Sequence, residues 1–154
     1  MSHEVQRTTL QAQPILYCAA QVSMTEMANV LGQLLPKVFG YATTSGATMV
    51  GPPFVRYLNK AATLDIQAGL PVAPGATASD DVSLGELPAG AAITTIHTGP
   101  YDGLPAAYAA LETWLKDNAV QPSGAPWEVY LTDPGEVPNP ADWKTQIFWP
   151  IGDA

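Results

Sequence analysis

The amino-acid sequence predicts one α+β domain of 154 residues in which a strand–helix–strand–strand module occurs twice. Two observations support this prediction. Two amphipathic helical segments are flanked by the same order of strand-like segments, and short stretches of the first half recur in the second. Consecutive strands joined by turns pair as antiparallel neighbours, and the two helices cover one face of the sheet. We therefore expect pseudo-two-fold symmetry with a central groove, which is a common kind of ligand site.

The first helix is predicted within residues 23–42, where apolar residues recur at steps of three and four. Ser23 and Glu26 have the spacing of a capping box at its N-terminus. Pro36 should kink the helix or shorten its last turn, because proline removes a backbone hydrogen bond.

The second helix is predicted within residues 101–118. Asp102 is the expected N-cap, and Pro105 falls in the first turn, where its missing N–H costs nothing. One apolar stripe follows, formed by Leu104, Ala107, Tyr108, Leu111 and Leu115.

Strand-like segments surround both helices, at 14–22, 52–59 and 62–72 and again at 91–99, 126–133 and 141–151, with further strands near 4–11 and 82–87. The stretch "VRYL" matches "EVYL" and places Tyr57 opposite Tyr130, 73 residues later. The stretch "IQAGLPV" matches "TQIFWPI" and places Pro71 opposite Pro150, 79 residues later. We therefore divide the domain into half-repeats at about 4–72 and 82–151, joined by a linker at 73–81.

Composition and missing motifs exclude several classes of protein. Fourteen acidic and six basic residues give a net charge of −8, which repels nucleic acid and anionic membrane surfaces. The chain has no run of 18 apolar residues and no signal-peptide pattern, so we expect a cytoplasmic protein. Cys18 is the only cysteine and His3 and His97 are far apart in sequence, so no metal site is expected. We find no glycine-rich phosphate loop and no nucleophile elbow, and we expect no cofactor.

A carboxylate interrupts the predicted strand "PWEVYLTDP" (126–134). Because strand side chains alternate, Glu128 and Tyr130 share one face, whereas Trp127, Val129 and Leu131 take the other. We expect the more apolar face to pack on a helix, so that Glu128 points toward the groove or toward solvent.

The duplication places aromatic and aliphatic side chains beside this carboxylate. The expected groove-side set is Val55, Tyr57, Glu128, Tyr130, Trp143 and Phe148. A carboxylate in such a frame favours an organic cation, which supplies both the opposite charge and a flat surface for cation–π contact. The alternative is an edge-strand glutamate that pairs with Lys144 or Arg56 across the sheet.

Several other residues have ordinary structural interpretations. His97 is expected to be a hydrogen-bonded structural histidine, and Tyr101 either packs under the second helix or faces the groove. Trp114, Trp149 and Phe54 are assigned to the core or its rim.

The stretches "HTGPYDGLPAAYAALETWL", "PWEVYLTDP" and "DWKTQIFWPI" resemble the GyrI-like small-molecule-binding family, in its free-standing form. The family also supplies effector-binding domains of bacterial transcription activators. The resemblance covers residues 4–151 and implies the duplicated fold. It implies that Glu128 is the buried glutamate that meets cationic, aromatic drugs, and that Trp143 lines the same pocket. Gln146 stands where many free-standing relatives have a glutamate.

We therefore expect binding or sequestration of hydrophobic, cationic aromatic small molecules, with the oligomeric state left open. The expected ligand-binding residues are Glu128, Tyr130, Trp143, Tyr57, Val55, Phe148, Tyr101 and Gln146. The resemblance leaves an enzymatic alternative, a hydrolase of electrophilic, cyclopropane-type molecules with Glu128 as general base. A third possibility is a protein-interaction or toxin-neutralising module.

Overall fold

The structure is a computed structural model that describes residues 3–23, 25–59, 63–132 and 136–152. The chain divides into two compact units. Unit 1 combines Met1–Gln11 with Ala89–Ala154, and unit 2 is Ala12–Pro88. All strand pairs within each unit are antiparallel. The α+β class predicted from the sequence is confirmed.

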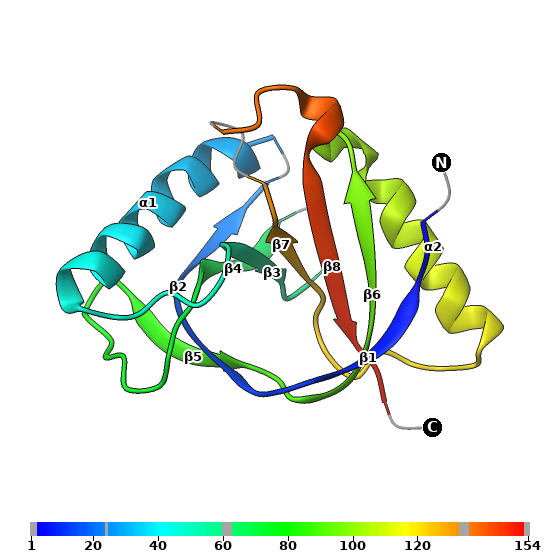
Figure 1. The fold of residues 1–154 in the computed structure, drawn as a ribbon, viewed down its shortest axis with the longest axis horizontal. Helices are drawn as coiled ribbons and strands as arrows, with labels where there is room; N and C mark the ends of the chain where they lie inside the picture. Colours follow the sequence, from blue (N-terminus) through cyan, green and yellow to red (C-terminus); the bar gives the residue numbers. More distant parts are fainter. Residues whose placement is uncertain (1–2, 24, 60–62, 133–135, 153–154) are drawn as a thin grey trace. The chain divides into compact units, whose positions relative to one another are not determined.

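Unit 1 has a sheet with one α-helix against it. Its described strands run in the order β1-β6-β8-β7. Their bounds are β1 Gln6–Leu10, β6 Gly90–Thr98, β7 Trp127–Tyr130 and β8 Lys144–Pro150, and the helices are η1 Tyr101–Gly103, α2 Leu104–Asp117 and η2 Pro140–Asp142. Helix α2 runs alongside β6 (Figure 1). The core beneath it includes Ile93, Leu111 and Ile147, all fully buried.

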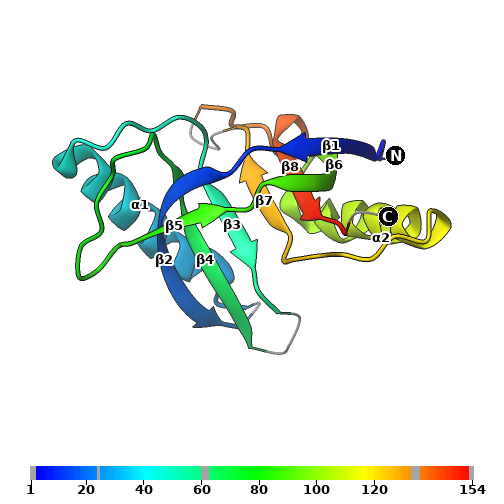
Figure 2. The same cartoon turned by 90° about the horizontal axis from the view of Figure 1, so that it is seen from below.

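Unit 2 has the same composition of elements. Its described strands run in the order β3-β4-β2-β5, with bounds β2 Gln13–Val22, β3 Phe54–Tyr57, β4 Leu64–Pro71 and β5 Ser83–Leu87. Helix α1, Met27–Ser45, packs on β2 and β4 (Figure 2). Its core includes Leu16, Cys18 and Val38, so Cys18 is a small core residue.

The strand register is the same in the two units. Val55 pairs with Ala68 in unit 2, and Glu128 pairs with Ile147 in unit 1. The equivalent positions are 73 residues apart on β3 and β7 and 79 apart on β4 and β8, which are the offsets of the two sequence matches. Each unit therefore has a strand–helix–strand–strand connectivity, while the duplication, a symmetry axis and a central groove remain predictions.

The edge strands are exchanged relative to the two halves of the sequence. Strand β1 pairs with β6 of the second half, and β5 pairs with β2 of the first half. The links at 11–12 and 88–89 are Gln-Ala and Pro-Ala, which lack the glycine or asparagine that a two-residue hairpin turn requires. The chain therefore continues past each link instead of folding back. The expected linker, residues 73–81, lies within unit 2.

The first helix differs from its prediction at both ends. It begins at Met27, and its N-cap residue Glu26 makes no side-chain capping bond, so the predicted capping box is wrong. The hydroxyl of Ser23 bonds to Thr25 instead. The helix continues through Pro36 to a left-handed C-cap at Gly46, because residues beyond the proline also pack into the core.

The second helix begins one residue later than we expected. Asp102 lies in η1 and Gly103 is the N-cap, whereas Pro105 is in the first turn as predicted. Among the described helices, none is long and apolar enough to cross a membrane.

Candidate functional site

Buried polar side chains are concentrated in unit 1. Within the described ranges, five polar side chains are buried, and all of them belong to that unit: Thr94, Thr95, His97, Glu128 and Thr145. Burial of a polar group is unfavourable unless a partner compensates it. This concentration of polar groups makes the sheet of unit 1 the candidate site.

Glu128 lies on the sheet face that is covered by helix α2. It pairs with Ile147, and directly paired residues point to the same side of an antiparallel sheet. Ile147 belongs to the core beneath α2. Our prediction that Trp127 and Val129 would face the helix is therefore wrong. Apolar character could not decide between the faces, because the helix-free face is also buried at Trp127, which is 3 % exposed.

Two phenols hold the carboxylate of Glu128. Tyr108, on α2, donates its hydroxyl to Oε2 at 2.7 Å, and Tyr130, two residues along β7, donates to Oε1 at 3.0 Å. Only 4 % of Glu128 is exposed. Hydrogen bonds to both oxygens stabilise the charged carboxylate and fix its orientation.

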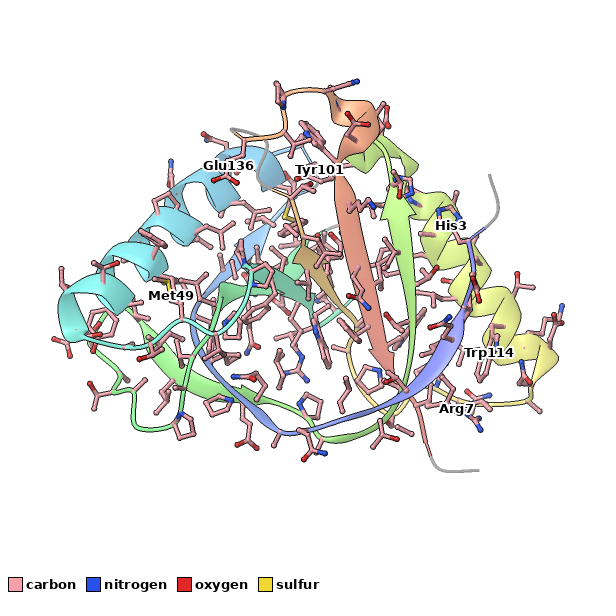
Figure 3. All side chains as sticks on the ribbon, viewed as in Figure 1. His3, Arg7, Met49, Tyr101, Trp114 and Glu136 are labelled. Atoms are coloured by element: carbon pink, nitrogen blue, oxygen red, sulfur yellow. The ribbon has the colours of Figure 1, made fainter. Side chains whose placement is uncertain are left out.

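An aromatic layer adjoins this carboxylate. Tyr101 in η1 lies 4.9 Å from Trp143 and 5.7 Å from Tyr130, measured between ring centroids. The indole N–H of Trp143 donates to the carbonyl of Val137 at 2.6 Å, and this bond fixes the ring. Tyr101 is 38 % exposed and is the outermost of the three rings; it is labelled in Figure 3. We call Tyr101, Tyr108, Glu128, Tyr130 and Trp143 the Glu128 cluster.

Four of the predicted ligand-binding residues lie outside this cluster. Phe148 stacks on Trp127, and Gln146 pairs with Val129, so both point to the helix-free face. The amide of Gln146 donates to Thr94 there, and a glutamate at that position would also point away from Glu128. Val55 and Tyr57 belong to unit 2, at the register positions of Glu128 and Tyr130. Their part in ligand binding remains a prediction.

A polar row continues from the cluster across the sheet. Thr145 pairs with Tyr130 on one side and with His97 on the other. Its hydroxyl is fully buried and has no hydrogen-bond partner among the described residues. The side chain of Thr145 is therefore the unsatisfied group nearest to the cluster in the strand register.

His97 is a buried structural histidine, as we predicted. Its Nε2 lies 2.9 Å from the carbonyl of Pro100, which can only accept, so the neutral ring carries its hydrogen there. Nδ1 then accepts from Nε2 of His3 at 3.0 Å, although 94 residues separate the two histidines. Burial, followed by the neighbouring His97, lowers the pKa of His3. The described part of the chain contains no group of three or more possible metal ligands.

Sequence reasoning missed Tyr108 and Thr145 as members of the site. Tyr108 was assigned to the apolar stripe of α2, where its ring does pack, at 6.3 Å from Trp149. Its hydroxyl was the available signal, because it is the one polar group in that stripe. Thr145 gave no sequence signal, since threonine is common in strands.

Comparisons with known proteins agree with this fold. The C-terminal domain of EcmrR matches with a TM-score of 0.86 at 22 % identity, and the match covers all of both chains. A hydrolase from Listeria innocua matches with a TM-score of 0.67 at 12 % identity, over 97 % of this chain and 92 % of the other. The structure of SAV2435 bound to tetraphenylphosphonium matches with a TM-score of 0.64 at 8 % identity, over 99 % of this chain and 94 % of the other. No curated protein sequence matches significantly.

The fold is that of a small-molecule-binding α+β domain. Residues 3–152 match the family described as the GyrI-like small molecule binding domain, and the chain belongs to that family. The resemblance noted from the sequence is thereby confirmed. Binding of small molecules is the general function that this membership gives.

Proposed function

We propose that the chain binds hydrophobic organic cations that carry aromatic rings, and that Glu128 recognises their positive charge. The observation that carries the proposal is a buried carboxylate held by two phenols at 2.7 and 3.0 Å. The phenols donate hydrogen bonds and carry no positive charge, so their bonds orient the carboxylate without neutralising it. A cation that comes close meets this charge in surroundings of low dielectric constant, where the attraction is strong.

The aromatic layer supports the same class of ligand. Tyr101, Tyr130 and Trp143 present ring faces and edges beside the carboxylate. A cation near such rings is attracted by their quadrupoles, by about 0.5–2 kcal/mol per contact. A ligand with both a charge and flat apolar groups would use the carboxylate and the rings together, whereas a small inorganic cation would use only the carboxylate.

Access to the carboxylate is expected to involve Tyr101. Glu128 is 4 % exposed, so a ligand must displace covering side chains to reach it. Tyr101 is the most exposed ring of the layer and stands in η1, a single turn in front of α2. A rotation of this side chain would uncover Tyr130 and Trp143 without breaking a strand pair.

Calorimetric titration with two ligands of similar shape tests the proposal. Methyltriphenylphosphonium is a cation, and triphenylphosphine oxide is its neutral counterpart. The cation should bind more tightly, by roughly 1–3 kcal/mol, the range of a contact with a charged group. Equal affinities would contradict the proposal. Tetraphenylphosphonium, which is bound in the solved structure of SAV2435, is a third ligand of the proposed class.

One observation supports a second candidate, the hydrolysis of electrophilic small molecules. The same phenols orient the carboxylate of Glu128, as a general base requires, and a phenol hydroxyl could return a proton to a leaving group. Incubation with a cyclopropane-containing electrophile, followed by mass spectrometry, tests this candidate. Turnover that Glu128→Gln abolishes would support hydrolysis. Binding without any change in ligand mass would instead support binding or sequestration.

A further inference from the structure

Arg56 stands on the helix-free face of the sheet of unit 2. Its neighbour Val55 pairs with Ala68, and Ala68 pairs with Cys18, which lies in the core beneath α1. Side chains alternate along a strand, so Arg56 points to the opposite face. Gln67, its direct partner on β4, points the same way.

One donor of the Arg56 guanidinium has no acceptor within the described part of the chain. Its Nε is buried without a hydrogen-bond partner. Burial lowers the pKa of Arg56, and the neighbouring Tyr17 acts in the opposite direction. Arginine carries five N–H donors in a fixed plane, and withdrawing one of them from water without an acceptor is unfavourable.

Two further donors lie near Arg56. Tyr17 on β2 pairs with Gly69, and Phe54, two residues before Arg56, pairs with the same glycine. Tyr17 therefore shares the face of Arg56. The hydroxyl of Tyr17 and the amide of Gln67 could both donate to an oxyanion beside the guanidinium. Carboxylate and phosphate groups match the arginine fork with two parallel hydrogen bonds.

We propose that Arg56, Gln67 and Tyr17 form a second binding site, for a small oxyanion of the carboxylate or phosphate class. The site belongs to unit 2 and uses none of the residues of the Glu128 cluster, so it does not depend on the proposed function. The net charge of −8 disfavours anions over most of the surface, and the guanidinium of Arg56 provides a local exception. Its ligand would complete the hydrogen bond that the chain leaves open.

Calorimetry and melting temperature of the whole chain test this site, with sodium benzoate and inorganic phosphate as probes and sodium chloride at equal ionic strength as the reference. At least one probe should bind and raise the melting temperature above that in chloride. Binding of benzoate but not phosphate would identify a carboxylate site, and binding of phosphate but not benzoate would identify a phosphate site. Binding of both probes would identify a general oxyanion site. Arg56→Met keeps most of the side-chain volume and should weaken binding roughly tenfold or more.

Two controls make the result specific. Arg7→Met removes an arginine of unit 1 that lies 5.4 Å from the ring of Trp114 (Figure 3), and it should leave anion binding unchanged. Arg56→Lys keeps a positive charge but loses the planar guanidinium that can make two parallel hydrogen bonds, so it should also weaken anion binding. This variant tests the site if Arg56→Met does not fold. Without anion, Arg56→Met should melt at the wild-type temperature or above it, because it removes a desolvated charge. Failure of both probes to bind, or equal binding by the Arg56 variants, would overturn the proposal.

Discussion

The hydroxyl of Tyr108 on helix α2 donates to Oε2 of Glu128 on strand β7 at 2.7 Å. This bond joins the helix to the sheet through a polar contact beside an apolar core, in which Leu111 and Ile147 are fully buried. A contact of this kind fixes the direction of the carboxylate, which is what recognition of a charge requires.

Tyr108→Phe should destabilise the chain because it removes one donor from a buried carboxylate. The expected loss is about 1–3 kcal/mol of unfolding free energy, measured by urea denaturation. Tyr41→Phe is the matched control, since the exposed Tyr41 hydroxyl donates to the neutral carbonyl of Thr77, also at 2.7 Å. It should lose less than about 1 kcal/mol. Equal losses would mean that the charge of Glu128 adds nothing to the Tyr108 bond.

Trp143→Ala and Tyr101→Ala should weaken the binding of both a cation and its neutral analogue, because the rings supply contact area to both, and the cation should lose more because it also loses its attraction to the ring quadrupoles. A loss of roughly 1–2 kcal/mol per ring is expected for the cation. Trp114→Ala removes a tryptophan of the same unit that contacts Arg7, away from the cluster, and should leave both affinities unchanged. An effect of Trp114→Ala as large as that of Trp143→Ala would contradict the location of the site.

Gly103→Ala should destabilise the turn that carries Tyr101. A Cβ at Gly103 would lie 2.6 Å from Cε1 of His97, so the imidazole would have to move. Gly40→Ala, on helix α1, would meet no atom within 4 Å and should stabilise the chain by roughly 1 kcal/mol through helix propensity. The melting temperatures of the two variants should therefore shift in opposite directions from that of the wild type. A Gly103→Ala variant as stable as wild type would contradict the packing of His97.

His3 should make stability fall as the pH is lowered through the range just below its ordinary pKa of 6.5. Burial and His97 lower its pKa in the folded chain, so the unfolded chain takes up the proton first. The contribution is present above pH 6.5 and is lost as the pH falls below that value through the lowered pKa of the folded chain. Urea denaturation between pH 7.5 and 5 should show a steeper decline for wild type than for His3→Gln. Parallel profiles would contradict the lowered pKa.

Most of the fold could be predicted because its signals are local. All eight described strands lie at or within one residue of the predicted segments, since β-branched and aromatic runs between turn residues need no tertiary information. The exchange of β1 and β5 between the halves could not be predicted from element order. It depends on whether the short links at 11–12 and 88–89 form hairpin turns, and the order of the elements does not determine this.

The site was predicted in part. Glu128, Tyr130, Tyr101 and Trp143 are together in unit 1. The direction of Glu128 was wrong because the strand is apolar on both faces, and alternation alone does not say which face the helix covers. Phe148 and Gln146 were expected on the same side as Glu128 and lie on the opposite face, because the side chains of a strand alternate and an error in one assigns the others to the wrong face as well.

The central claim is that the charge of Glu128 selects cations, and the variant Glu128→Gln tests it most directly. The amide keeps the size of the side chain and removes the charge. Calorimetry should compare methyltriphenylphosphonium with triphenylphosphine oxide on wild type and variant. We predict that the variant loses roughly 1–3 kcal/mol of binding free energy for the cation and much less for the neutral ligand. Equal losses for both ligands, with the variant folded as judged by circular dichroism, would contradict the claim and assign Glu128 to folding alone.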